Sequence, residues 1–346
     1  ITEAGNFEGE NILHLPLSVE EFAEREEISA ASLRADREEW RKQLLAARQE
    51  RVTPLRDEKI LTAWNGLMIA ALAKGFAVTG EKRYLAAAAN AVDFIKKRLL
   101  EPNGRLLHCY YAGESSIHGF LEDYTFFIWG LIEMYEATLE DKYLADAIAF
   151  SKEVMRLFAD EFSYGLYDTA SDAENILVRK KSAADGVVPS ANSVAAVNFL
   201  RLGRMMVKQK YIKEGEGILR SMMGDLLAQP SSYIHSLAAL DYLRGPDIDI
   251  TLVGKRKDPE LEDMLRSINV RFIPGLALRF KDPETESTDY KSIGGRATAY
   301  ICSQEICRPP VIGKAALVKV LAAKAAAVRP ERSEDPPTDL QATLKG

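Results

Sequence analysis

The stretch GFLEDYTFFIWGLIEMYEAT, at residues 119–138, decides the fold. Written as an α-helix it is apolar on nearly every side, which predicts a helix surrounded by other helices. Two further segments share this character, and short turns with a Lys/Arg-Tyr-Leu/Ile core, at Tyr84, Tyr143 and Tyr211, join all three to amphipathic segments. The repeat predicts helical hairpins, with inner helices over residues 58–78, 119–138 and 190–207 and outer helices over 83–100, 142–158 and 211–228.

The connections from outer to inner helices are long, and they define one rim of the predicted fold. Residues 102–118 and 161–189 contain Gly and alternating Leu/Tyr patterns, so we expect two β-hairpins there. Hairpins that repeat every 60 to 70 residues or so favour an α/α toroid, a mainly α fold whose long loops gather at the N-termini of the inner helices. Further helices are expected over residues 18–29 and 32–49, both highly charged, and over 231–243, an inner helix.

After Gly245 the pattern changes to that of a small α/β appendage. Strands are expected over residues 247–254, 270–280 and 297–303, and helices over 259–267 and 314–328. We therefore expect three parts: an incomplete toroid over residues 1–245, the appendage over 246–328, and a flexible tail rich in Pro, Glu, Ser and Asp over 329–346.

Composition excludes several classes of partner. The 346 residues are 47% hydrophobic and 28% charged, with a net charge of −6, so no basic surface for nucleic acid or an anionic membrane is expected. No apolar run approaches the roughly 20 residues that a membrane span needs. Three cysteines cannot form a disulfide framework, which favours a cytoplasmic location. A chain that opens on Ile1 in a polar stretch is expected to be part of a longer polypeptide.

Polar residues gather at the predicted starts of the inner helices, where they are expected to form one polar bowl. Asp123 is the leading candidate for an acid or base, because an unpaired carboxylate in an otherwise apolar helix is costly. For Asp57 and Ser190, helix capping is the simpler interpretation. The candidate set is Arg56, Asp57, Trp64, Asn65, Glu122, Asp123, Tyr124, Asp185, Ser190 and Asn192.

An acid/base pair needs a second group besides Asp123. Glu122 points in a different direction on the same helix, so Asp57 or Asp185 is the expected second carboxylate, and its separation from Asp123 would indicate retaining or inverting glycoside chemistry. His108 and His118 lie in the rim hairpin, where a neutral imidazole can act as a base. With four histidines and no phosphate-binding Gly-rich loop, we expect no metal and no cofactor.

Aromatic and cysteine residues leave alternatives open. Trp64, Tyr124 and Trp129 can offer stacking faces to sugar rings, although aromatics at helical spacing are more often core, above all Trp129. Cys302 and Cys307 are spaced to form a local disulfide or a reactive redox pair, and two reduced thiols are the plainer alternative. Cys109 stands alone, and we expect it to serve packing.

Four motifs resemble the YyaL-like, spermatogenesis-associated family: RDEKILTAWNGLMIAAL at 56–72, residues 119–138 quoted above, DGVVPSANSVAAVNFLRL at 185–202 and AYICSQEICRPP at 299–310. The resemblance runs from Ile1 to about Pro310. It implies a six-hairpin-glycosidase-like (α/α)₆ part, related in fold to N-acylglucosamine 2-epimerases, which in the family follows an N-terminal thioredoxin-like domain. We expect the given sequence to lack that domain and the first barrel helices, and therefore to form a partial barrel.

The resemblance places eight candidates at signature positions of the family, without a catalytic role for any of them: Asp57, Trp64, Asn65, Asp123, Tyr124, Asp185, Ser190 and Asn192. We therefore expect a sugar or sugar-like ligand in the rim bowl, and either a sugar isomerase or epimerase or a glycoside hydrolase. The alternative is a non-catalytic helical scaffold that presents a client to an upstream thioredoxin-like domain. A histidine near the ligand would indicate an isomerase, two flanking carboxylates a hydrolase, and a shallow rim a scaffold.

Overall fold

The computed structural model describes residues 2–12, 14–174, 177–245, 247–284, 289–303 and 306–327. The chain forms two compact units, Ile1–Asp57 and Glu58–Gly346. The predicted tail over residues 329–346 lies outside the described residues.

The N-terminal unit contains a helical pair, as the sequence predicts. Helix α1 (Val19–Arg25) starts at Ser18, whose backbone N–H donates to the Glu21 carboxylate while its hydroxyl accepts from the Glu21 N–H. This reciprocal capping satisfies two backbone donors that a helix start leaves open. Helix α2 (Ala30–Gln49) follows a turn in which Glu27 adopts a positive φ, so α1 ends earlier than expected.

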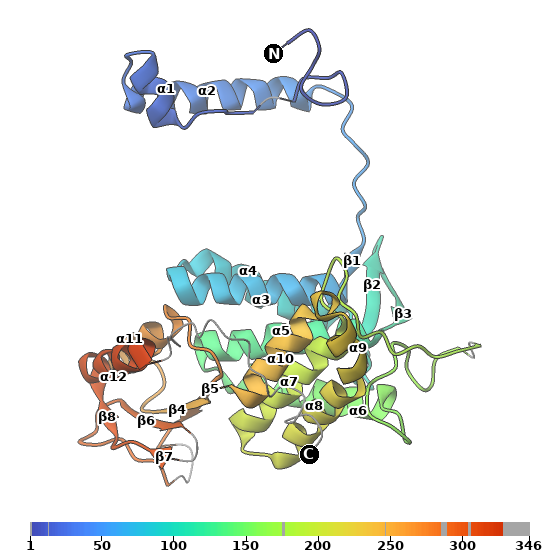
Figure 1. Ribbon diagram of the computed structural model, residues 1–346, viewed down its shortest axis with the longest axis vertical. Coiled ribbons are helices and arrows are strands. Elements are labelled where there is room, and N and C mark those ends of the chain that lie inside the picture. Colours follow the sequence, from blue (N-terminus) through green and yellow to red (C-terminus); the bar gives the residue numbers. More distant parts are fainter. Residues whose placement is uncertain are drawn as a thin grey trace. The chain divides into compact units, whose positions relative to one another are not determined.

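In the second unit, inner and outer helices alternate along the chain, and the predicted fold class is confirmed (Figure 1). The inner helices are α3 (Thr62–Thr79), α5 (Leu121–Thr138), α7 (Ala191–Met206) and α10 (Ile234–Arg244). The outer helices are α4 (Lys82–Arg98), α6 (Asp141–Phe158) and α8 (Gln209–Ser221). The single outer helix expected over residues 211–228 is wrong in one respect, because the chain turns at Met222 and continues as a separate helix α9 (Met223–Ala228).

Each repeated turn is built around a residue in the left-handed conformation. Three inner helices end at Gly80 (φ 76°), Leu139 (φ 58°) and Val207 (φ 55°). In each case the tyrosine of the turn follows four positions later, at Tyr84, Tyr143 and Tyr211. A left-handed residue ends a helix and redirects the chain, so the repeated tyrosines mark repeated geometry.

Helices α3 and α5 approach each other closely at two glycines. A Cβ atom on Gly66 would lie 2.5 Å from the backbone carbon of Phe126, and one on Gly130 would lie 2.9 Å from the carbonyl oxygen of Gly66. Helix α5 is buried on nearly all sides, with Phe127 and Leu131 fully inaccessible, as its apolar sequence predicts.

The connection before α5 is the predicted β-hairpin. Strand β2 (Leu107–Tyr111) pairs with β3 (Glu114–His118) across a two-residue turn in which Ala112 and Gly113 both have positive φ. That turn matches the right-handed twist of the strands. A short strand β1 (Ile60–Leu61), which the sequence did not predict, pairs with β2 immediately before α3. It fixes the hairpin against the start of α3.

The connection before α7 is not the β-hairpin expected over residues 161–189. Its described residues, 161–174 and 177–189, contain no strand, only an isolated bridge between Ala159 and Leu166. Its backbone partners are mixed: Asn192 bonds both the N–H and the C=O of Leu166, and Asp168 accepts from the N–H of Ser182, whereas the N–H of Asp168 donates to the carbonyl of Lys180. After α9, the 3₁₀ turn η1 (Pro230–Ser232) leads into α10.

The α/β appendage contains a mixed sheet in the order β5-β4-β6-β7, with β8 also paired to β6. Strand β4 is parallel to β5 and antiparallel to β6. The strand expected over residues 270–280 starts later, because Pro274 has no N–H to donate and Gly275 has a positive φ. The elements are β4 (Ile248–Val253), α11 (Pro259–Asn269), β5 (Leu276–Lys281), β6 (Thr298–Ser303), β7 (Ile306–Cys307), β8 (Val311–Ile312) and α12 (Gly313–Ala327).

The appendage is attached at the C-terminal ends of the inner helices (Figure 1). Arg204, near the end of α7, donates to Oδ1 of Asp249 on β4 at 2.5 Å. The backbone N–H of Phe280 donates to the hydroxyl of Tyr135 at 3.1 Å, and Tyr242 donates to a β5 carbonyl at 3.2 Å. The opposite, N-terminal ends of the inner helices carry the long loops and most of the predicted site residues.

Candidate active site

Asp123 lies at the meeting point of three segments and has no exposed surface. Its Oδ1 accepts the backbone N–H of Ala63 at the start of α3, at 2.9 Å, and its Oδ2 accepts the N–H of Phe120 before α5, also at 2.9 Å. Nδ1 of His108, on β2, lies 2.9 Å from Oδ2 and 3.2 Å from Oδ1. The buried carboxylate that the sequence singled out is therefore fully partnered, and an external ligand does not touch it directly.

His108 is the partner of this carboxylate that keeps some exposed surface. Because two N–H groups already donate to the Asp123 carboxylate, the carboxylate acts as acceptor and Nδ1 of His108 carries the hydrogen. The hydrogen bond from Nδ1 to Asp123 raises the pKa of His108, although burial opposes the shift. The side chain is 20% exposed, and among the described residues Nε2 has no hydrogen-bond partner. A carboxylate that holds one ring nitrogen leaves the other free to accept a proton.

Two further predicted residues are sequence neighbours of Asp123 and of Ala63, whose N–H donates to Asp123. Glu122 is half-buried, and burial, followed by the negative charge of Asp123, raises the pKa of its carboxyl group. Trp64 follows Ala63 on α3, and its side chain is 64% exposed. Asn65, next in sequence, donates from Nδ2 to the carbonyl of Leu61 at 2.8 Å and so stabilises the helix start.

A small apolar cluster joins the starts of three inner helices. It consists of Ala63 from α3, Phe126 from α5 and Val194 from α7, with Leu67, Trp129 and Val188 packed against it. The starts of α3, α5 and α7, which were predicted to converge, therefore pack against one another through apolar side chains.

Asp185 holds the starts of α7 and α10 together. Its Oδ1 accepts the N–H of Ser190 at 2.9 Å, and its Oδ2 accepts the N–H of His235 at 2.8 Å. Ser190 in turn accepts the N–H of Ser193 as the N-cap of α7. Among the described residues, Asp185 and Asp123 have no hydrogen-bond partner in common. Ser190 therefore caps α7, which was the simpler interpretation of this residue, and Asp185 binds backbone N–H groups at the starts of both helices.

His235 is a site residue that the sequence analysis missed. Its ring lies 5.1 Å from that of Trp129, tilted by 42°, and its Nε2 is buried with no partner among the described residues. Burial lowers the pKa of His235 and so favours the neutral ring. No sequence motif surrounds His235. The signal that could have identified it is its position in the first turn of an inner helix, which it shares with Asp123.

Two predicted ligand-binding residues, Tyr124 and Asn192, are buried and hydrogen-bonded to the backbone, and two further candidates lie in the N-terminal unit. Tyr124 is fully buried between Phe150 and Phe158, and its hydroxyl accepts the N–H of Leu106 at 3.0 Å; burial raises its pKa. Asn192 is buried and fastens the loop before α7. Arg56 and Asp57 belong to the N-terminal unit and are exposed there.

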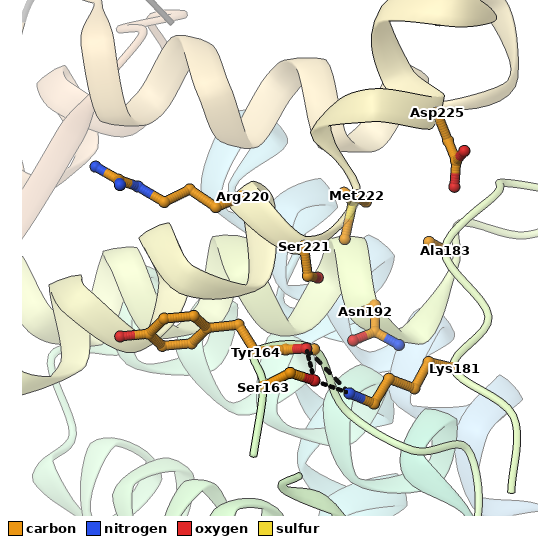
Figure 2. A pocket seen from close by; sticks show the side chains of 10 residues that line it. Ser163, Tyr164, Lys181, Ala183, Asn192, Arg220, Ser221, Met222 and Asp225 are labelled. Carbon is orange, nitrogen blue, oxygen red and sulfur yellow. Dashed lines mark hydrogen bonds between the residues drawn. The ribbon is translucent and has the colours of Figure 1, made fainter. Parts of the chain in front are cut away.

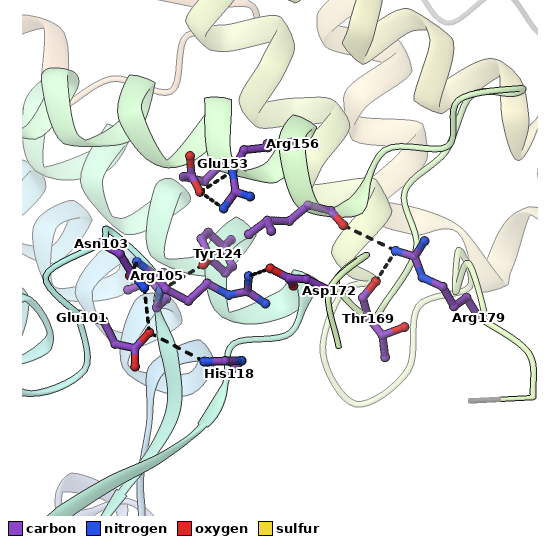
Figure 3. Close-up of polar contacts among 12 residues, drawn as sticks. Glu101, Asn103, Arg105, His118, Tyr124, Glu153, Arg156, Thr169, Asp172 and Arg179 are labelled. Atoms are coloured by element: carbon purple, nitrogen blue, oxygen red, sulfur yellow. Dashed lines mark hydrogen bonds and ion pairs between the residues drawn. The ribbon is translucent and has the colours of Figure 1, made fainter. Parts of the chain in front are cut away.

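Behind the hairpin, a polar layer ties the loop before α7 to the segment before β2 (Figure 3). Arg105 is buried and pairs with Asp172 at 2.7 Å, which lowers the pKa of that carboxyl group. Arg179 donates to the carbonyl of Thr169 at 2.5 Å. His118 is exposed and lies 3.7 Å from a carboxylate oxygen of Glu101, so the two histidines of the hairpin have different surroundings.

A cavity of about 470 Å³ lies between this loop and helices α8 and α9 (Figure 2). Lys181 on its wall donates to Asp160, to the hydroxyl of Ser163 and to a backbone carbonyl, so its ammonium group is already satisfied. Of the predicted site residues only Asn192 lines this cavity. The cavity is therefore distinct from the His108 dyad.

Further along the inner helices, a buried ion cluster connects α3, α5 and α7. Arg201 pairs with Glu133 at 2.7 Å and with Glu136 at 2.8 Å, and Lys74 pairs with Glu133 at 2.7 Å. Burial opposes ionisation of Glu133, but Arg201 and Lys74 outweigh it and lower the pKa of Glu133 to about 2. The cluster neutralises charges in the interior of the ring of helices.

The three cysteines differ in state. Cys302 and Cys307 form a disulfide, so the interpretation as two reduced thiols is wrong, because pairing of β6 with β7 brings the two residues directly opposite each other. Cys109 is a free, buried thiol. Within the described residues, none of the helices has both the length and the apolar character that spanning a bilayer requires.

The chain is similar to the human protein named spermatogenesis-associated protein 20, with 28% identity over 352 residues that cover 93% of this chain and 44% of the relative. The homology inferred from the four motifs is thereby confirmed, and the chain spans less than half the length of that relative. No family model matches the chain. Among solved structures it aligns with an α-mannanase of glycoside hydrolase family 76 from Bacteroides thetaiotaomicron (14% identity, TM-score 0.44, 63% of this chain and 58% of the other). It also aligns with cellobiose 2-epimerase from Bacillus thermoamylovorans (15% identity, TM-score 0.41, 50% and 45%).

Proposed function

We propose that the helical unit is a sugar isomerase or epimerase in which His108 is the general base. The observation that carries the proposal is the contact between Nδ1 of His108 and Asp123, which fixes the tautomer, while Nε2 has no hydrogen-bond partner among the described residues. In such a reaction Nε2 removes the proton from the carbon next to the sugar carbonyl. The proton then returns to the neighbouring carbon, or to the other face of the same carbon.

Asp123 is a positioning residue in this proposal. A carboxylate without exposed surface, which already accepts bonds from Ala63, Phe120 and His108, does not reach a ligand. Its negative charge strengthens His108 as a base, since the same hydrogen bond raises the pKa of the imidazole.

Glu122 supplies the acid that the reaction needs near the carbonyl oxygen. The half-buried carboxyl group has a raised pKa and therefore keeps its proton to higher pH than an exposed glutamate. In its protonated form this carboxyl group would donate to the oxygen on which negative charge develops while His108 removes the proton.

The surroundings of the dyad favour a hydroxylated ring as substrate. The exposed indole of Trp64 offers an apolar face for the C–H side of a sugar, and Glu122 and His108 offer partners for hydroxyl groups. Sugar binding at this rim is part of the proposal, as is catalysis itself.

A glycoside hydrolase is less well supported by the same geometry. Hydrolysis needs two carboxyl groups that flank the bond to be cut. Asp123 is occupied by its three partners, and Asp185 is occupied by the starts of α7 and α10.

Ligand binding is tested by thermal unfolding in the presence of aldoses, N-acetylated amino sugars and disaccharides. A ligand that binds only the folded state raises Tm by mass action. We expect one class of sugar to raise Tm, and we expect Trp64→Ala to abolish the rise. Trp40→Ala, in the N-terminal unit, removes another exposed indole and serves as the matched control. If no sugar raises Tm, or if both variants respond alike, the non-catalytic scaffold becomes the better account.

A further inference from the structure

The disulfide between Cys302 and Cys307 lies in the α/β appendage, and the proposed sugar chemistry does not involve it. It joins residues that face each other across the pairing of β6 with β7, only five positions apart in sequence. Closing so short a loop restricts the unfolded chain much less than closing a long one does. The appendage already has its own apolar core, built from β4, β5, β6 and α11, so the disulfide is not needed to hold a poor core together.

The position of the pair leaves one of its two residues exposed. Strand β7 is the last strand in the sheet order, and its residues Ile306 and Cys307 are both exposed, Ile306 at 74%. Cys302, on the inner strand β6, is half-buried. Thiol–disulfide exchange requires that a thiolate approach one sulfur atom, and exposed disulfides are the labile ones. Cys307 is therefore the accessible member of the pair.

The pair also lies beside the contact that attaches the appendage to the helices. Cys302 is the direct partner of Asp249 in the pairing of β6 with β4, and residues opposite each other in a sheet share one face. Asp249 on that face holds Arg204 of α7 and Arg279 of β5. Opening the disulfide would thus free β7 next to the ion pairs that bind the sheet to the helical hairpins.

We propose that Cys302 and Cys307 form a redox-active site that accepts two electrons from a dithiol reductant. A thiolate of the dithiol attacks Sγ of Cys307, the bond between Cys307 and Cys302 breaks, and Cys302 leaves as a thiolate that takes up a proton. The second thiol of the reductant then attacks the mixed disulfide at the reductant's own sulfur. This step releases Cys307 as a thiol and closes a disulfide in the reductant, so that two electrons and two protons have passed to the protein.

The third cysteine provides an internal control for the test. Cys109 is buried in the helical unit at 6% exposure, so it reacts with a labelling reagent only when that unit unfolds. The full chain, oxidised, is incubated with dithiothreitol without denaturant, then alkylated and measured by mass spectrometry. We expect two labels, on Cys302 and Cys307, and none on Cys109. Labels that appear only in denaturant, together with the label on Cys109, would show a purely structural disulfide and overturn the proposal.

The identity of the attacked sulfur is tested with two single variants. Cys302→Ser leaves the exposed Cys307, and Cys307→Ser leaves the half-buried Cys302. With glutathione disulfide as the probe, we expect the Cys302→Ser protein to form its mixed disulfide at least about tenfold faster, because exchange depends on access to the sulfur. Equal rates, or a faster reaction of the Cys307→Ser protein, would contradict attack at Cys307.

Discussion

Nδ1 of His108 lies 2.9 Å from Oδ2 of Asp123, although the two residues belong to different elements, strand β2 and helix α5. The contact depends on strand β1, which holds β2 against the start of α3, and on the N–H groups of Ala63 and Phe120, which orient the carboxylate. A weakly exposed histidine with one nitrogen fixed and the other free is the arrangement on which the proposed function rests.

The pH dependence of stability gives the first prediction. The folded-state pKa of His108 is raised, so its contribution to the free energy of unfolding is fully present below the ordinary histidine pKa of about 6.5 and is lost as the pH rises through the folded-state value. We expect His108→Asn to destabilise the protein more at pH 5.5 than at pH 9, measured by urea unfolding. In an Asp123→Asn background this pH dependence should disappear. A destabilisation by His108→Asn that stays constant from pH 5.5 to 9 would show that Asp123 does not stabilise the imidazolium.

The close approach of α3 and α5 gives the second prediction. Gly66→Ala would place a Cβ 2.5 Å from backbone atoms of Phe126, and backbone cannot yield as a flexible side chain can. We expect a loss of about 2–3 kcal/mol or more in the free energy of unfolding. Gly75→Ala on the same helix meets only the Tyr84 ring at 3.4 Å and is the matched control, expected to be neutral or slightly stabilising. Equal effects of the two substitutions in chemical denaturation would contradict the observed helix crossing.

The buried ion cluster gives the third prediction. Because the pKa of Glu133 falls from 4.5 to about 2 on folding, its ionised form stabilises the protein above about pH 4.5, and this contribution is lost as the pH falls towards 2. Glu133→Gln should flatten the loss of stability between pH 5 and pH 3, and at pH 7 it should cost about 3–5 kcal/mol because it leaves Arg201 less well paired. Glu153→Gln, on α6, is the control, because it removes a carboxylate whose partner Arg156 is exposed, and it should cost much less stability at pH 7. The measurement is Tm as a function of pH, and parallel curves for wild type and Glu133→Gln would be inconsistent with the cluster.

Hydrophobic periodicity predicted the helices well because their faces are set by burial. The inner helix α5 and its turn at Tyr143 follow directly from that pattern. The loop over residues 161–189 was predicted wrongly, because the backbone of Leu166 bonds the Asn192 side chain and the N–H of Tyr167 donates to the carbonyl of Phe158 at the end of α6, so these residues do not pair with a second strand. Alternation along one segment does not reveal whether a partner strand exists.

The candidate site was predictable only in part, since a sequence shows which residues start a helix but not which way they face. Asp123 was singled out by the cost of burying a carboxylate, and the structure shows the partners that offset this cost. Its neighbour Tyr124, equally prominent in the sequence, points into the core instead. The pairing with His108 depends on the register of β1 and β2, which no local pattern encodes.

The most direct test of the account is proton transfer itself. Sugars that raise Tm, together with a panel of aldoses, are incubated with the protein in D₂O, and NMR follows the C2–H signal and the appearance of the isomeric sugar. We predict conversion by the wild type that falls about 10²–10⁴-fold in His108→Asn, while His14→Asn, in the N-terminal unit, retains full activity. If the wild type converts no sugar, or if His108→Asn converts it as fast as the wild type does, His108 is not the base of a sugar isomerase or epimerase.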